Sequence, residues 1–368
     1  MARTGKAVIC RELNKPVVVE PVSVDAPKRG EVTVKIAACG VCHSDLSATN
    51  GTIALPPPLV LGHEAAGEVI EVGEGVTGLA VGDHVVSSFI YMCGRCRFCA
   101  AGRPVLCIEQ GKALTTPPEG TPRVKDAAGK PLGIFSGCGV MAEYATLSVD
   151  NLVRIDPKIP LDRAALVGCA VTTGVGAVFN TAKVEPGSSV AVFGCGGVGL
   201  NVVQGAAIAG AERIIAIDTL PEKLEMAKRF GATDTVLAKP GEDTAKALKK
   251  MTGGGPDYAF ECVGAGVLAE TAYRAIRRGG KAVIVGVARP TESTAFKPMT
   301  MVFEEKTLQG SYFGSSVPRI DFPKMLQLYM AGRLKLDELI THRYKIDEAP
   351  QAFADLESGR NARGVIVF

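Results

Sequence analysis

A glycine-rich segment near the middle of the chain constrains its fold more than any other feature of the sequence. Residues 194–199, GCGGVG, fit the pattern G-x-G-x-x-G directly after the apolar run 190–193, and a helical pattern follows at 200–209. In that context the glycines let the backbone approach a pyrophosphate, and the helix N-terminus faces its negative charge. The segment therefore predicts a strand, turn and helix that bind a dinucleotide through Gly194, Gly196, Gly197, Val198 and Gly199. Tight packing of strand on helix is the alternative role for these glycines.

The rest of this region repeats the same alternation of buried strands and helices. Strands are predicted at 190–193, 214–217, 235–237, 258–261, 282–285 and 307–309, and helices at 200–209, 221–230, 244–251 and 268–275. Six strands joined by right-handed crossovers form a doubly wound parallel sheet.

The first half of the chain has a different sequence pattern. Short β-prone runs at 33–37, 68–72, 84–88 and 143–147 are separated by glycine and proline turns, which is typical of an irregular all-β unit. Residues 115–130 look like an exposed loop, and the tail adds a helix at 322–331 and a strand at 364–368. We expect the tail to return to the first unit, so that residues 1–170 and 313–368 form one domain and residues 171–312 the other.

Composition excludes several classes of protein. The 41 basic and 38 acidic side chains nearly balance, which argues against a nucleic-acid partner. With 47% hydrophobic residues the chain can bury a large core. The first residues lack the apolar core of a secretory signal, and the uncharged stretch 187–211 carries Asn201, Gln204 and several glycines, unlike a membrane span. A globular enzyme of the cytoplasm is the expectation.

The second predicted strand of the sheet ends in Asp218, about 20 residues after the glycines, where a carboxylate accepts from ribose hydroxyls. A 2'-phosphate would be repelled by Asp218, and neither Thr219 nor Leu220 supplies a cation for it. NAD is therefore favoured over NADP. Lys223, one helical turn further on, could reach the ribose or could be a solvated helix lysine.

Four of the eleven cysteines lie in one short stretch, which argues for metal rather than a disulfide framework. Cys93, Cys96, Cys99 and Cys107 follow the spacing C-x2-C-x2-C-x7-C, which lets a loop wrap a tetrahedral zinc with no open position. Such a site is structural. A redox C-x-x-C pair and an iron–sulfur cluster are the alternatives.

Three further candidate ligands, Cys42, His63 and Cys169, are scattered along the chain. Each alone is ambiguous, because a single buried cysteine is commonly an inert small hydrophobe and a single histidine is commonly a core residue.

The assembled motifs resemble those of the zinc-dependent medium-chain alcohol dehydrogenase family along nearly the whole chain. The resemblance rests on GVCHSD at 40–45, GHEAAG at 62–67, the four-cysteine loop, GCAVTTG at 168–174, GCGGVG at 194–199 and LITH at 339–342. It implies an α/β protein with a GroES-like irregular β catalytic domain and a doubly wound Rossmann cofactor domain. It also implies two zinc ions per subunit and NAD.

The resemblance assigns roles to single residues around the catalytic zinc. Cys42, His63 and Cys169 would hold the ion with the fourth place open, in the Cys2His set known for alcohol dehydrogenases. Ser44 would take the proton of the alcohol, Asp45 would accept from the free ring nitrogen of His63, and Glu64 would tune the metal from outside the ligand set.

The resemblance also implies contacts to cofactor and substrate. Thr173 and Val198 match positions that press on the nicotinamide, and Arg363 and His43 match positions that bind the pyrophosphate. Val287 matches a position beside both the cofactor and the substrate pocket. Phe89 and Phe135 match positions that line the substrate channel. Filling of the core is the alternative role for the two phenylalanines.

Two departures from the family pattern matter, at residue 47 and at the residue after the first zinc ligand, where the family has Arg or His and this chain has His43. Ser47 stands where many relatives have the histidine that completes a proton relay to solvent. Ile53 and Gly111 stand where the glutathione-dependent formaldehyde dehydrogenase branch has an acid and an arginine.

The predicted function is zinc-dependent oxidation of primary aliphatic or aromatic alcohols to aldehydes, or the reverse, by hydride transfer to or from NAD. A dehydrogenase of thiol adducts such as S-hydroxymethyl thiols is the first alternative, and a non-catalytic zinc and nucleotide-binding protein the second. The long segment between Cys107 and Phe135 matches the dimeric branch of the family, so we expect a homodimer that pairs through the sheet edge near 300–309.

Overall fold

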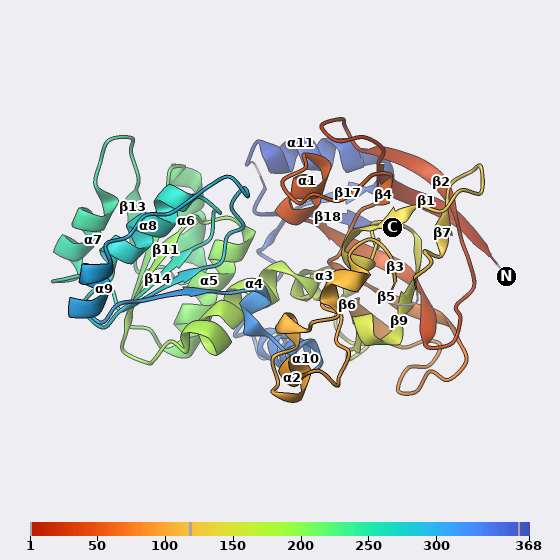
Figure 1. Cartoon of the computed structure of the whole chain (residues 1–368), viewed down its shortest axis with the longest axis horizontal. Coiled ribbons are helices and arrows are strands. Elements are labelled where there is room, and N and C mark those ends of the chain that lie inside the picture. Colours follow the sequence, from red (N-terminus) through yellow and green to blue (C-terminus); the bar gives the residue numbers. More distant parts are fainter. Residues whose placement is uncertain (1, 118–119, 360) are drawn as a thin grey trace. The chain divides into compact units, whose positions relative to one another are not determined.

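The computed structural model describes residues 2–117, 120–359 and 361–368, which fold into two compact units (Figure 1). Unit 1 comprises Met1–Cys169, Val317–Gly332 and Leu336–Phe368, and unit 2 comprises Ala170–Ser316 and Arg333–Lys335. The second boundary lies at Ser316 rather than at the predicted residue 312, and residues 333–335, predicted to belong to the first domain, group with unit 2. The backbone N–H of Lys335 donates to the side chain of Gln204 on a helix of unit 2, which explains that grouping.

Unit 1 is built on two β-sheets. The smaller sheet has the order β7 (Val124–Lys125), β2 (Val18–Val24), β1 (Arg3–Cys10), β4 (Leu59–Val60) and β8 (Gly133–Ile134). The larger sheet has the order β10 (Leu152–Arg154), β6 (His84–Ser87), β5 (Ala65–Val72), β3 (Glu31–Val41), β18 (Arg363–Val367) and β17 (Ile340–Lys345), with β9 (Tyr144–Ser148) also paired to β3.

Strand β3 is the centre of the larger sheet and leads to the candidate site. It runs well beyond the predicted range 33–37, because its apolar residues are buried almost to its end at Val41. The C-terminal strand β18 pairs antiparallel with β3, so the tail of the chain completes the sheet of unit 1. Helices α1 (His43–Thr49), α2 (Arg97–Ala100), α3 (Leu161–Ala165) and α11 (Ala349–Glu357) complete this unit together with α10 (Pro318–Met330).

Unit 2 contains a six-stranded, fully parallel sheet. Its order is β13 (Asp234–Leu237), β12 (Arg213–Asp218), β11 (Ser189–Phe193), β14 (Tyr258–Glu261), β15 (Lys281–Ile284) and β16 (Thr307–Gly310). The helices of this unit include α4 (Ala170–Gly176), α5 (Gly197–Ala209), α6 (Pro221–Arg229), α7 (Thr244–Met251) and α8 (Gly266–Ala275). Numbered within this sheet, the strand order is 3-2-1-4-5-6, the doubly wound order of dinucleotide-binding folds, so the predicted fold class is confirmed.

Helices α9 and α10 depart from the predicted elements in the second half of the chain. Residues expected at the sheet edge near 300–309 form helix α9 (Pro298–Phe303) before β16 begins, so only Thr307–Gly310 is strand. Helix α10 begins at Pro318 rather than at 322, although Pro323 lies inside it. A proline at the first helical position suits helix geometry, and the Asp321 carboxylate accepts from the backbone N–H of Val317 at 2.6 Å, which fixes that start.

No single helix in the described ranges is long and apolar enough to cross a membrane, although the bent pair of helical segments Leu161–Gly168 and Ala170–Ala182 passes that test together by length and composition. The uncharged stretch 187–211 forms β11 and α5.

Candidate functional site

The scattered candidate ligands come together in unit 1. Cys42 follows β3 and caps α1, His63 lies between β4 and β5, and Cys169 directly follows a short turn of helix at Leu166–Gly168. Their ligand atoms and a carboxylate oxygen of Glu64 all lie within 4.8 Å of one another, and all four residues are buried. Glu64, predicted to act from outside the ligand set, has its carboxylate within reach of the three ligand atoms.

Asp45 organises this cluster. Its Oδ1 accepts from the backbone N–H of Gly62 at 2.9 Å and lies 3.3 Å from His63 Nδ1, and its Oδ2 accepts from the backbone N–H of Cys42 at 3.3 Å. A proton on Nδ1 that faces this carboxylate leaves the Nε2 lone pair free for a metal. The Nε2 atom is buried and has no hydrogen-bond partner among the residues that the structure describes. Asp45 therefore holds two ligand segments in place and lies where its carboxylate can accept from a proton on His63 Nδ1.

Two aromatic rings hold the His63 imidazole edge-on. The ring centroids of Phe89 and Phe135 each lie 5.3 Å from that of His63, at interplanar angles of 83° and 86°. This edge-to-face geometry is favourable between such rings. Phe135 is only 1% exposed and belongs to the core, whereas Phe89 is partly exposed. The structure thus gives Phe135 a clear packing role, and Phe89 is the more accessible of the two predicted pocket residues.

Glu64 forms a buried ion pair with Arg363, the residue predicted to bind pyrophosphate. Burial raises the pKa of the Glu64 carboxyl, and the Arg363 guanidinium opposes that rise. A Cβ atom on Gly40 would lie 2.3 Å from Glu64 Oε1, so glycine at 40 makes room for this carboxylate. Sequence reasoning missed this pair, because its members are far apart in the chain and no local pattern connects them.

Ser87 is a second residue that sequence reasoning missed. Its hydroxyl accepts from the backbone N–H of Ala65 at 2.9 Å and lies 3.4 Å from the carbonyl oxygen of His63. It thereby ties β6 to the segment that carries His63. The sequence pattern indicates only that this residue lies within the predicted strand 84–88.

The donor atoms fit zinc. Two cysteine sulfurs and one imidazole nitrogen form a borderline-soft set that zinc prefers, and three protein ligands leave a fourth position for a reacting molecule. The buried Nε2 of His63 without a partner supports that assignment, because a buried polar atom is otherwise unfavourable. Ser44 stands beside the cluster, with its Oγ 3.8 Å from Cys42 Sγ, and His43 is exposed at the start of α1.

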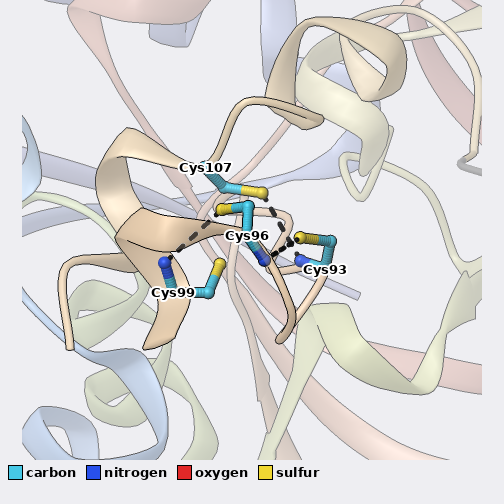
Figure 2. Close-up of side chains that lie close together, drawn as sticks. All are labelled: Cys93, Cys96, Cys99 and Cys107. Carbon is cyan, nitrogen blue, oxygen red and sulfur yellow. Dashed lines mark hydrogen bonds between the residues drawn. The ribbon is translucent and has the colours of Figure 1, made fainter. Parts of the chain in front are cut away.

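The four cysteines of the loop form the second metal-binding cluster of unit 1 (Figure 2). Three of these sulfurs accept a hydrogen bond from a backbone N–H group of the cluster. The N–H of Cys93 donates to Cys107 Sγ at 3.4 Å, that of Cys96 to Cys93 Sγ at 3.4 Å, and that of Cys99 to Cys96 Sγ at 3.5 Å. All four sulfurs lie within 4.8 Å of one another, and tetrahedral zinc with bonds of about 2.3 Å needs sulfurs about 3.8 Å apart.

The electrostatics of the loop also favour a cation. Backbone N–H groups of Cys99 and Ile108 lower the pKa of Cys96 to about 6. Burial, together with the neighbouring sulfurs of Cys96 and Cys107, raises the pKa of Cys99 to about 12. Four thiolates at this distance repel one another, so a divalent cation is needed for all four to be ionised. A cluster with four protein ligands has no open position, as predicted for a structural zinc.

The glycine segment of unit 2 has the geometry that a dinucleotide needs. Helix α5 begins at Gly197, inside the motif and three residues earlier than predicted, so its free N–H groups lie in the glycine segment itself. Gly194 has φ +89°, and a Cβ on Gly199 would lie 1.8 Å from the carbonyl oxygen of Gly194. By contrast, a Cβ on Gly196 would meet nothing within 4 Å, which leaves room for a phosphate.

Asp218 is anchored at the end of β12. Its Oδ2 accepts from the backbone N–H of Cys195 at 2.8 Å, and its Oδ1 accepts from Thr219 at 2.8 Å and Leu220 at 3.1 Å. These bonds orient the carboxylate beside the glycine segment, and each carboxylate oxygen can still accept from a ribose hydroxyl. Lys223 is partly buried on α6.

The predicted nicotinamide contacts lie on two packed helices of unit 2. Gly174 of α4 approaches α5 so closely that a Cβ would lie 2.5 Å from the carbonyl oxygen of Val198. Thr173 and Val198 are therefore on neighbouring helices, and both are partly exposed. Val287 follows β15 and is exposed, with its carbonyl oxygen 2.5 Å from the position of a Cβ on Gly264.

Residues 53 and 111, at which the glutathione-dependent formaldehyde dehydrogenase branch has an acid and an arginine, both lie in unit 1. Ile53 packs against the hydrophobic core, and Gly111 is exposed with nothing within 4 Å of a Cβ placed on it. Neither residue brings a charge to the site.

Comparisons with known proteins support the resemblance over the whole chain. Residues 28–157 match the model of the alcohol dehydrogenase GroES-like domain, and residues 197–331 match that of the zinc-binding dehydrogenases. A curated relative, the S-(hydroxymethyl)glutathione dehydrogenase of Synechocystis, is 41% identical and covers 98% of this chain and 99% of its own.

Two solved structures agree with the fold. An alcohol dehydrogenase zinc-binding domain protein from Burkholderia ambifaria matches with a TM-score of 0.95 and 35% identity, over 100% of both chains. The benzyl alcohol dehydrogenase of Acinetobacter calcoaceticus matches with a TM-score of 0.91 and 31% identity, over 100% of this chain and 99% of that one. With its GroES-like sheets, its Rossmann-type sheet and two clusters that fit zinc, the chain belongs to the zinc-dependent medium-chain alcohol dehydrogenase family.

Proposed function

We propose that this protein catalyses hydride transfer between a primary alcohol and NAD at a zinc held by Cys42, His63 and Cys169. The observation that carries the proposal is the buried His63 Nε2, which has no partner in the described part of the chain and lies within 4.8 Å of two cysteine sulfurs. The substrate would be an uncharged aliphatic or aromatic alcohol, and the product the aldehyde.

The residues of unit 1 divide the chemistry between them. Zinc held by Cys42, His63 and Cys169 would supply a Lewis acid that lowers the pKa of the alcohol hydroxyl, and NAD would supply the hydride acceptor. Ser44, beside Cys42, would accept the hydroxyl proton while it passes its own proton on, and since residue 47 is serine rather than histidine, water would take that proton to solvent. Asp45 keeps the Nδ1 proton of His63 in place throughout, so the Nε2 atom remains a ligand.

The preference for NAD rests on Asp218. Its carboxylate is fixed by three backbone N–H groups beside the glycine segment, so a 2'-phosphate at that ribose would meet a negative charge that cannot move away. We expect NAD to give a kcat/KM at least about 100-fold higher than NADP. The opposite preference would contradict this assignment.

An S-hydroxymethyl thiol adduct is the second candidate substrate, and the names of the curated relatives favour it over a simple alcohol. Against a glutathione adduct stand Ile53 and Gly111, because neither supplies a charge to pair with the ionised groups of glutathione. A smaller or less charged thiol adduct meets no such objection.

A direct assay separates the two candidates. Formation of reduced NAD is measured with benzyl alcohol, hexanol, S-hydroxymethylglutathione and the hydroxymethyl adduct of 2-mercaptoethanol, each in separate reactions. Higher kcat/KM for benzyl alcohol supports the first candidate, and higher kcat/KM for either adduct supports the second. Absence of turnover with all four, while metal analysis shows two zinc ions per chain, would reject the proposed reaction for these substrate classes.

We further propose a cytoplasmic homodimer. Strand β16 is an edge of the sheet in unit 2, and the preceding helix α9 exposes Met299, Val302 and Phe303. An apolar helix face beside an open sheet edge favours pairing with a second copy. Light scattering after size-exclusion chromatography tests the dimer, and the mass of a tetramer or monomer would contradict it.

A further inference from the structure

A pocket in unit 2, separate from the glycine segment, has features of a binding site. It has a volume of ≈ 630 Å³ and lies between helices α7 and α8, residues 295–300 and Lys306. This volume falls within the range for sites of small organic ligands. Neither the glycines of the motif nor Asp218 or Lys223 lines it. Lys306 immediately precedes β16, at the N-terminal end of the parallel strands, whereas the glycines follow β11 at the carboxyl end.

An aromatic wall contains a polar atom without a partner. Tyr273 and Phe296 lie with ring centroids 5.9 Å apart at 57°, and Tyr273 is 3% exposed. The Tyr273 hydroxyl is buried and has no hydrogen-bond partner among the described residues. A buried hydroxyl is unfavourable without a partner, so a ligand acceptor at this place would satisfy it.

The charge of the pocket is positive. Lys306 is buried, with its Nζ 2.8 Å from Glu304 and 5.5 Å from the centroid of the Tyr273 ring. Arg274 pairs with Asp243 at 2.6 Å. Of the remaining lining charges, Lys246, Lys249 and Lys297 make no ion pair among the described residues, and Glu270 is the one acid. Glu304, which pairs with Lys306, also lies close enough to interact with Lys249 and Tyr273. This surplus of cations around an aromatic wall favours an anion with a ring.

We propose that this pocket is a second ligand site, which binds a small aromatic molecule carrying one anionic group. The ring packs against Tyr273 and Phe296, and the anionic group accepts from the Tyr273 hydroxyl and from the ammonium of Lys249. The site is independent of the proposed reaction, because none of its residues belongs to the zinc clusters or the predicted cofactor site.

The test uses 2-naphthoate as the probe and 2-naphthamide as its uncharged match, with binding measured by calorimetry on the zinc-loaded full chain. We expect naphthoate to bind at least about tenfold more tightly than the amide, because a charged group adds stronger hydrogen bonds. Equal affinity for the two probes, or no binding of either, would overturn the proposal.

Variants locate the binding. Lys249→Gln is expected to weaken naphthoate affinity about tenfold and Tyr273→Phe about fivefold, while Lys250→Gln, on the same helix but outside the pocket, leaves it unchanged. Tyr273→Phe removes only an unpartnered hydroxyl, so it should not lower the midpoint of thermal unfolding. Unchanged naphthoate affinity in both pocket variants would place the probe elsewhere, for instance at the catalytic zinc, and would overturn the proposal.

Discussion

The two metal clusters of unit 1 both use cysteine sulfurs, but one is formed by a single short loop and the other by residues far apart in the chain. The four-cysteine cluster lies within residues 93–107, is partly exposed, and is shaped by backbone N–H groups of the loop itself. The catalytic cluster draws on Cys42, His63 and Cys169, is buried, and is positioned by the side chains of Asp45 and Ser87. A local cluster depends on spacing, whereas a distributed one depends on the fold around it. The same substitution should therefore have different consequences in each.

Cys169→Ser should have the largest effect on catalysis. Serine is a poor zinc ligand, so we expect one zinc per chain instead of two and a fall in kcat/KM of at least about 1,000-fold, or about 4 kcal/mol. Loss of this zinc also removes a crosslink between distant segments, so the midpoint of thermal unfolding should fall as well, and activity is therefore measured well below that midpoint. Metal analysis, kinetics and calorimetry test this, with Cys138→Ser as a control that retains both ions.

Cys96→Ser should affect stability rather than chemistry. A metal that clips residues 93–107 restrains the unfolded chain as a crosslink does, so its loss is expected to cost about 3 kcal/mol and to lower the unfolding midpoint by roughly 6–12 °C. Activity measured well below that midpoint should remain within about tenfold of the parent. If Cys96→Ser and Cys169→Ser gave the same pattern, the division into structural and catalytic clusters would be wrong.

Asp45→Asn should have a smaller effect that only the distributed cluster can show. The amide keeps the size of the side chain but no longer fixes the Nδ1 proton of His63, so we expect a loss of about 10–100-fold in kcat/KM or in affinity for the catalytic zinc. Zinc in the four-cysteine loop should be unaffected. The matched control is Asp347→Asn, which removes an exposed carboxylate paired with Lys6. Parent-like kinetics and zinc affinity in Asp45→Asn would show that Asp45 does not position His63.

The same contrast explains how much of the molecule the sequence predicts. The six strands of unit 2 were predicted within about two residues, because buried parallel strands are short apolar runs bounded by turns. Helix α9 was missed, since its valine, phenylalanine and threonine are typical of strands and no apolar periodicity marks it as a helix. The four-cysteine cluster was predicted from its spacing alone.

The catalytic cluster could not be derived in the same way. Its ligands lie in separate segments, and family resemblance rather than local chemistry brought them together. The Glu64–Arg363 pair and the hydroxyl of Ser87 had no local signal at all, because both depend on strands that meet only in the folded sheet. The burial of Phe135 is a property of packing, which a sequence pattern of that length does not contain.

The smallest predicted effect distinguishes a side chain that lines the substrate pocket from one that fills the core, where both contact the zinc ligand His63. Phe89 and Phe135 touch the same imidazole at the same distance, but Phe135 is buried and Phe89 is partly exposed. Phe89→Leu should therefore raise KM for benzyl alcohol about fivefold, through loss of an aromatic contact of about 1 kcal/mol, with little change in unfolding free energy. Phe135→Leu should instead reduce unfolding free energy by about 1–2 kcal/mol and leave KM nearly unchanged. Equal shifts in KM for both variants would show that the buried ring of Phe135 also contacts the substrate. The exposed fraction of a side chain would then not predict which residues line this pocket.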